Sequence, residues 1–64
     1  MTHLLILQAK KVKETEGAYK GFYRTEFYLN SKLQAIIPAA HKQPKRGKKT
    51  QTLNCCEYLL EWVD

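Results

Sequence analysis

The chain has 64 residues, with 11 Lys and Arg against six Asp and Glu, and a net charge of +5. So short a chain has room only for a thin core, so we expect residues 1–64 to form one small domain. The adjacent Cys55 and Cys56 exclude an intrachain disulfide framework and favour a reducing compartment. Only residues 4–7 are consecutively apolar near the start, so we expect no signal peptide or membrane span and a cytoplasmic location.

The first half of the chain predicts three strands. Residues 4–12 and 22–29 alternate or cluster apolar and aromatic residues in the way that strands do, and the polar, glycine-containing stretch 14–21 between them suits a loop. Asn30-Ser31 is typical of a tight turn into a third strand at residues 32–37, which Pro38 closes because it cannot donate to a strand ladder. These patterns predict a three-stranded antiparallel meander.

The end of the chain predicts a helix at about residues 53–63. Asn54, followed by Glu57 three residues later, has the spacing of a capping box. We therefore predict an α+β fold, a three-stranded antiparallel sheet with one C-terminal helix packed on one face, in which Cys56 and Trp62 belong to the core. The apolar stripe of this helix would be Cys55, Cys56, Leu59, Leu60 and Val63, and its polar side Asn54, Glu57, Glu61 and Asp64.

A basic loop at residues 38–51 joins the two predicted parts. Within residues 41–49, five of nine side chains are cationic, and Gly47 would allow close approach of the backbone to a ligand. All 11 Lys and Arg lie in residues 1–49, which contain only three Glu. This part of the chain therefore carries a net charge of +8, which would attract polyanions. The alternative is a solvated loop that keeps the protein soluble.

The charge pattern predicts a protein that binds nucleic acid mainly through backbone phosphates. An anion at the start of the predicted helix would also relieve the unfavourable placement of Lys48 and Lys49 beside the positive end of the helix dipole. The candidate nucleic-acid-binding residues are Lys42, Lys45, Arg46, Lys48, Lys49, Lys10, Lys11, Lys13 and Arg24.

The lysine pair also carries a resemblance to a known family. Lys48-Lys49, followed by the small pair Cys55-Cys56 and then Leu59-Leu60, resembles the carboxy-terminal part of double-stranded RNA-binding domains. The resemblance covers about residues 14–62 and implies that Lys48 and Lys49 contact duplex phosphates. The chain departs from the family in having no amino-terminal helix and in having a longer stretch between residues 30 and 48.

Aromatic residues form the second candidate site. Several aromatic residues between positions 19 and 28 are interleaved with Lys20 and Arg24, a composition that suits stacking of single-stranded bases. Tyr23 and Phe27 share one face of the predicted strand, and we expect both in the core. The candidates for base stacking, or for a dimer interface, are Phe22, Tyr28 and Tyr19.

No pattern indicates catalysis, a metal or another cofactor. His3 and His41 lack a recognised ligand spacing with the cysteines, and no acidic pair or phosphate-binding loop is present. We therefore expect no enzyme. The alternative function is a small regulator or inhibitor, of the kind that phages and mobile elements encode, which binds a host protein through a sheet edge or an exposed aromatic face. A homodimer or an acidic protein partner is also compatible, and the sequence leaves DNA or RNA, and single or double strand, open.

Overall fold

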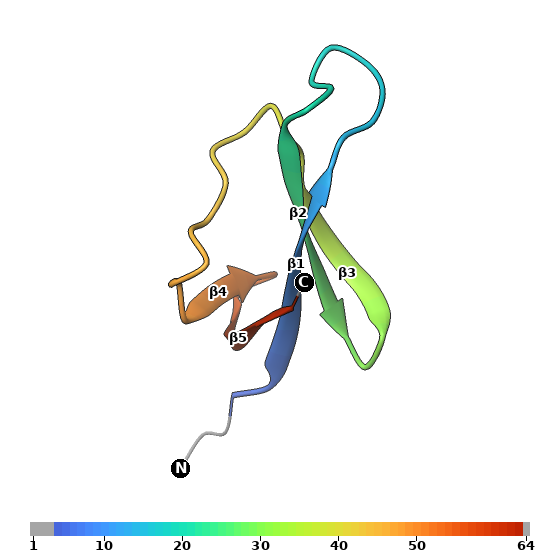
Figure 1. Ribbon diagram of the computed structural model, residues 1–64. Coiled ribbons are helices and arrows are strands. Elements are labelled where there is room, and N and C mark those ends of the chain that lie inside the picture. The colour runs from blue at the N-terminus through green and yellow to red at the C-terminus, as the bar shows by residue number, and fades with distance from the viewer. Residues whose placement is uncertain (1–3, 64) are drawn as a thin grey trace.

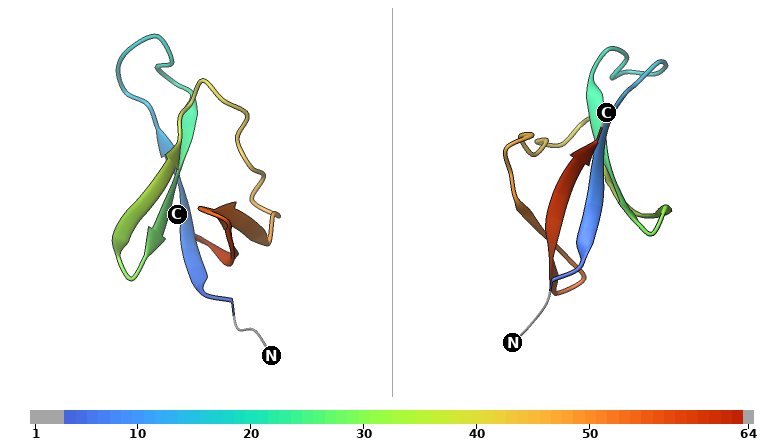
Figure 2. Two further views of the ribbon diagram at one scale, coloured as in Figure 1. Left: turned by 180° about the vertical axis from the view of Figure 1, so that it is seen from behind. Right: turned by 60° about the horizontal axis from the view of Figure 1, so that its bottom comes forward.

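The computed structural model describes residues 4–63, which form five strands in one curled sheet and no helix (Figure 1). The strands are β1 (Ile6–Lys13), β2 (Tyr23–Leu29), β3 (Lys32–Ile37), β4 (Thr50–Leu53) and β5 (Cys56–Val63), in the spatial order β3-β2-β1-β5-β4. The central strand β1 runs parallel to β5, and every other neighbouring pair is antiparallel (Figure 2). The predicted α+β fold class is therefore wrong.

The meander of β1, β2 and β3 forms one half of this sheet. Its loop and tight turn lie where the sequence places them, and Asn30 and Ser31 have φ angles of 51° and 65°. Two consecutive positive φ values are those of a two-residue type I′ turn, whose twist matches that of the strands it joins. The local sequence is therefore sufficient to specify this hairpin.

The predicted helix is a second hairpin, made of β4 and β5. Its turn is Asn54-Cys55, with φ angles of 51° and 67°, so Asn54 is a turn residue and not a helix cap. The apolar residues of β5 alternate, with Tyr58, Leu60 and Trp62 on one face, and this face packs against the core. Cys55 and Cys56 are both exposed, so the prediction of Cys56 as a core residue is wrong, whereas Trp62 does pack against the core.

The two faces of the sheet differ in chemistry. The inner face holds the fully buried Leu7, Ala9 and Phe27, with partly buried apolar residues of β2, β3, β4 and β5 around them. Strand register places all acidic residues of the described strands on the outer face: Glu26, Glu57 and Glu61. Asp64, assigned to the same polar group by the helix prediction, lies outside the described residues, as does His3.

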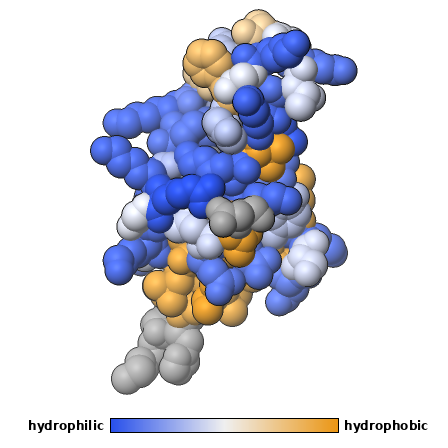
Figure 3. Space-filling view, viewed as in Figure 1, coloured by the Kyte–Doolittle hydropathy of each residue, from blue (hydrophilic) through white to orange (hydrophobic). Residues whose placement is uncertain are grey.

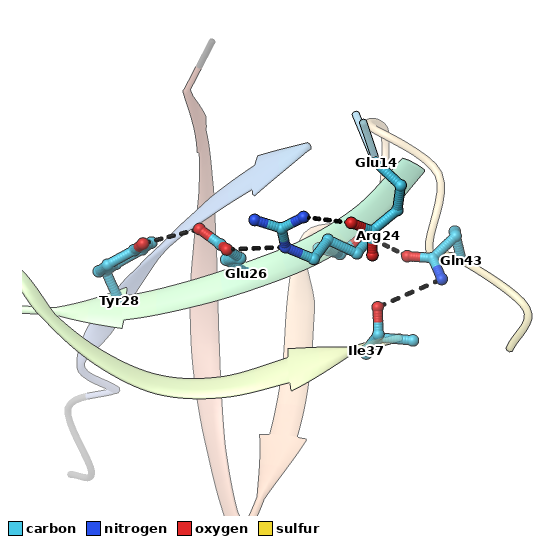
Figure 4. A network of polar contacts seen from close by, with 7 residues as sticks. Glu14, Arg24, Glu26, Tyr28, Ile37 and Gln43 are labelled. Atoms are coloured by element: carbon cyan, nitrogen blue, oxygen red, sulfur yellow. Dashed lines mark hydrogen bonds and ion pairs between the residues drawn. The ribbon is translucent and has the colours of Figure 1, made fainter. Parts of the chain in front are cut away.

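Residues 38–49, which we call the connector, cross the inner face from β3 to β4. Gln43 fixes the connector, because its side-chain Oε1 accepts a hydrogen bond at 2.6 Å from the hydroxyl of Thr25, which is fully buried on the inner face. The Nε2 group of Gln43 donates to the carbonyl oxygens of Ile37, Pro38 and His41 at 3.3, 2.7 and 2.9 Å. One amide side chain therefore joins the connector to both β2 and the end of β3 (Figure 4).

Candidate nucleic-acid interface

Lys11 links the connector to the sheet. Its side chain lies on the inner face of β1, where Nζ donates to the carbonyl oxygen of Pro44 at 2.7 Å and lies 5.7 Å from the centroid of the Trp62 ring. Burial lowers the pKa of Lys11, and the nearby charge of Arg46 lowers it further. A carbonyl group and an aromatic ring stabilise the ammonium without neutralising it. Lys11 therefore contributes positive charge to the surface beside the connector.

The end of β1 and the start of β2 (residues 12–13 and 23–24) form a projecting two-stranded ribbon, which we call the β1–β2 ribbon. β5 pairs with β1 only as far as Lys10, and β3 pairs with β2 only from Thr25 onward, so neither strand flanks Lys13 and Tyr23. These two residues are cross-strand partners on the inner face. Tyr23 is 48% exposed and lines a surface hollow with Lys11 and Arg46. The prediction of Tyr23 as a core residue is therefore wrong.

The connector supplies further cations to the same side of the sheet. Its backbone is held at the β4 end, where the Trp62 indole donates to the Lys48 carbonyl at 2.9 Å and the Leu60 amide donates to the Lys49 carbonyl at 2.8 Å. The ammonium of Lys48 donates to Gln51 Oε1 at 2.8 Å. In Figure 3 hydrophilic side chains project from the side along which the connector runs in Figure 1. The exposed connector cations are Lys42, Lys45, Arg46, Lys48 and Lys49.

Two of the predicted binding residues lie on the opposite face. Arg24 forms ion pairs with Glu14 at 2.6 Å and Glu26 at 2.9 Å (Figure 4). Lys10 is the cross-strand partner of Glu26. The hydroxyl of Tyr28 donates to Glu26 at 2.7 Å. This hydrogen bond is the main cause that lowers the pKa of Glu26, with Arg24 adding to the effect and burial opposing it. Arg24 and Lys10 therefore belong to a surface where acids already balance the cations.

The three aromatic candidates do not lie together: two are in the loop between β1 and β2, and the third, Tyr28, is on the outer face. Tyr19 and Phe22 lie in the loop between β1 and β2, with ring centroids 6.0 Å apart at an interplanar angle of 82°. Both rings are exposed, Phe22 to 61%. The same hydrogen bond to Glu26 holds the Tyr28 hydroxyl on the outer face and raises the pKa of Tyr28. The residue that sequence reasoning missed is Tyr23, because only the lengths of the neighbouring strands expose it.

Metal and membrane features are not found in the part of the chain that the structure describes. No group of three His, Cys, Asp or Glu side chains there could hold a metal ion. Residues 4–63 likewise contain no helix long and apolar enough to cross a membrane.

Comparisons with protein-family models, with curated proteins and with solved structures find no match to this chain. The resemblance to double-stranded RNA-binding domains therefore stays a prediction. The helix that would present its lysine pair is absent from residues 4–63, where Lys48 and Lys49 instead precede β4.

Proposed function

We propose that the protein binds nucleic acid, mainly through backbone phosphates, with the connector and the inner side of the β1–β2 ribbon. The observation that supports this function best is the separation of charge between the two faces. The cations of the connector lie on the side where Lys11 and Lys13 point, whereas the acids of the described strands all lie on the other side. Such a one-sided field attracts polyanions and favours phosphate contact over recognition of base sequence.

The test is a salt titration of binding with a fourfold variant in which Lys45, Arg46, Lys48 and Lys49 are replaced by Gln. Each lost phosphate contact makes the slope of log K against log salt shallower by about 0.7 to 0.9. We expect the fourfold variant to lose affinity at least about 10-fold and to have a slope shallower by about 3. Fluorescence anisotropy with a labelled oligonucleotide measures both, and circular dichroism checks that the variant is folded. Unchanged affinity in a folded variant would exclude the connector as the binding site.

A matched pair of single variants separates the two faces. Lys13→Gln should weaken binding and make the salt slope shallower by about one contact, whereas Lys10→Gln should change neither, because Lys10 lies beside Glu26 on the outer face. Equal losses in the two variants would mean that the ligand does not distinguish the faces, and would contradict the proposed surface.

The exposed state of Cys55 and Cys56 supports the cytoplasm as the proposed location. Two accessible thiols without disulfide partners are compatible with a reducing compartment. We propose no enzymatic activity and no cofactor for the protein.

The second candidate function is that of a regulator that binds a host protein by strand addition. One observation favours it: β3 is an edge strand of the sheet, and its Leu33 and Ile36 are 46% and 43% exposed. An edge strand offers unpaired backbone groups to an extended segment of a partner. A charge-neutral double variant, Leu33→Lys with Ile36→Glu, should abolish capture of such a partner while leaving oligonucleotide binding intact. If oligonucleotide binding is absent at low salt and capture depends on these two residues, this second function replaces the first.

A further inference from the structure

The β1–β2 ribbon exposes aromatic rings beside its cations. Tyr23 and Phe22 are consecutive residues that are 48% and 61% exposed, and Tyr19 packs edge-on against Phe22. An exposed aromatic ring adds little to folding stability, because it is not removed from water. Backbone hydrogen bonds of the loop set the positions of Tyr19 and Phe22. The Phe22 amide donates to the Tyr19 carbonyl at 2.9 Å, and the Glu14 amide donates to the Phe22 carbonyl at 2.8 Å. The loop thus holds these rings in an ordered arrangement at the surface.

Tyr23 is the ring that lies among the cations. Its cross-strand partner is Lys13, and directly opposed side chains in a sheet have Cβ atoms about 5 Å apart. Lys11 and Arg46 line the same hollow as Tyr23. Lys11 lies two residues before Lys13 on the same face of β1, about 7 Å away along the strand. A chain of phosphates that follows these cations would therefore bring its bases within reach of the Tyr23 ring.

We infer that the ligand is a single-stranded nucleic acid, whose phosphates bind Lys11, Lys13 and Arg46 while a base stacks on Tyr23. This inference rests on the proposed function and adds the class of nucleic acid to it. Single strands present unstacked base faces, and proteins that bind them combine a cationic groove with exposed aromatic rings. A duplex stacks its bases on one another, so Tyr23 would have no partner there.

The experiment compares three labelled probes of equal length: an oligothymidine, the same oligomer with abasic sites, and a DNA duplex. Anisotropy titrations use the wild-type protein, Tyr23→Leu, Tyr23→Phe and Tyr28→Leu. We expect the wild type to bind the oligothymidine at least about 10-fold more tightly than the duplex. Tyr23→Leu should weaken that binding by about 5- to 150-fold, the loss for one stacked base, and leave the salt slope unchanged. Tyr23→Phe keeps the ring and should bind within about 2-fold of wild type.

Tyr28→Leu is the matched control, because the same substitution on the outer face should leave affinity unchanged. The abasic probe needs no variant at all: it should bind wild type as weakly as the oligothymidine binds Tyr23→Leu. Equal affinity for duplex and single strand, or an abasic probe that binds as well as the oligothymidine, would overturn the inference. Those outcomes leave phosphate binding in place, whereas loss of the proposed function would appear as failure of all three probes to bind at low salt.

Discussion

The two faces of the sheet give the same amino acids different roles. Three pairs of identical neighbours have one member on each face, because successive side chains of a strand point in opposite directions. In each pair the first residue is on the outer face and the second on the inner face. The pairs are Lys10-Lys11, Ile36-Ile37 and Leu59-Leu60.

The two faces differ in how their cationic side chains are paired. On the outer face Arg24, Glu26 and Glu14 satisfy one another through ion pairs, so the surface there is locally balanced. On the inner face Lys11 is held by the Pro44 carbonyl and the Trp62 ring, and the connector adds further cations. Net charge alone therefore does not locate a binding surface, since the pairing of cations with acids decides where a bound anion is stabilised most.

The largest expected effect comes from the leucine pair. Leu60 packs against the core, whereas Leu59 is 40% exposed. Leu60→Ala should lower the free energy of unfolding by about 2 kcal/mol or more, and Leu59→Ala by less than about 1 kcal/mol. Urea denaturation measures both values. A helix at residues 53–63 would place both leucines in one apolar stripe, so two large and equal losses would contradict the strand.

A smaller loss is expected when the connector is released from the inner face. Gln43→Ala removes the partner of the buried Thr25 hydroxyl and three donations to backbone carbonyls, which should cost about 1 to 3 kcal/mol of unfolding free energy. Amide hydrogen exchange should also become faster in residues 38–49. The control is Gln34→Ala, since Gln34 is exposed and donates only to the Lys32 carbonyl at 3.3 Å. Equal stability of the two variants would mean that Gln43 does not fix the connector.

The smallest effect is a pH dependence that belongs to the outer face. The pKa of Glu26 is lowered in the folded protein, first by the hydrogen bond from Tyr28. Its contribution to stability is therefore fully present above the ordinary carboxyl pKa of about 4.3, and is lost as the pH falls through the lower folded value. Thermal melts between about pH 6 and pH 2 should show a weaker acid dependence for Glu26→Gln than for wild type.

The matched control for this pH effect is Glu61→Gln, also on the outer face, where Gln8 is the hydrogen-bond partner of Glu61 at 3.4 Å. We expect this variant to keep the acid dependence of the wild type. An acid dependence that disappears equally in both variants would assign the effect to overall charge and not to the network of Glu26.

The second hairpin shows where sequence reasoning went wrong. Residues 56–63 satisfy two periodicities at once. Leu60 belongs both to an apolar stripe at helical spacing and to the alternation of Tyr58, Leu60 and Trp62, whereas Leu59 fits only the stripe. A local signal for the turn was present: Leu53-Asn54-Cys55 repeats the pattern of Leu29-Asn30-Ser31, where Asn also begins a two-residue turn. The choice of strand depends on pairing between β5 and β1, which are about 50 residues apart along the chain.

The candidate site was predictable in composition but not in arrangement. The cationic side chains of the connector, together with Lys11 and Lys13, were all among the residues predicted to bind, and the structure places them on one side of the sheet. Lys10 was not separable from them, because its position opposite Glu26 depends on the register of β1 and β2. The ion pair of Arg24 with Glu26, two residues apart on one face of β2, follows from strand alternation. The exposure of Tyr23 was not predictable either, since it depends on where β3 and β5 stop.

The sequence by itself determined the local features of this protein: the first three strands, the turn at Asn30-Ser31, the exclusion of a disulfide framework and the excess of cations before residue 50. These depend on residues close together in the chain, where alternation and turn chemistry act directly. Only the tertiary structure decided that residues 56–63 are a strand and that the connector crosses the inner face. Both depend on contacts between distant segments, which stabilise one of several conformations that the local sequence allows.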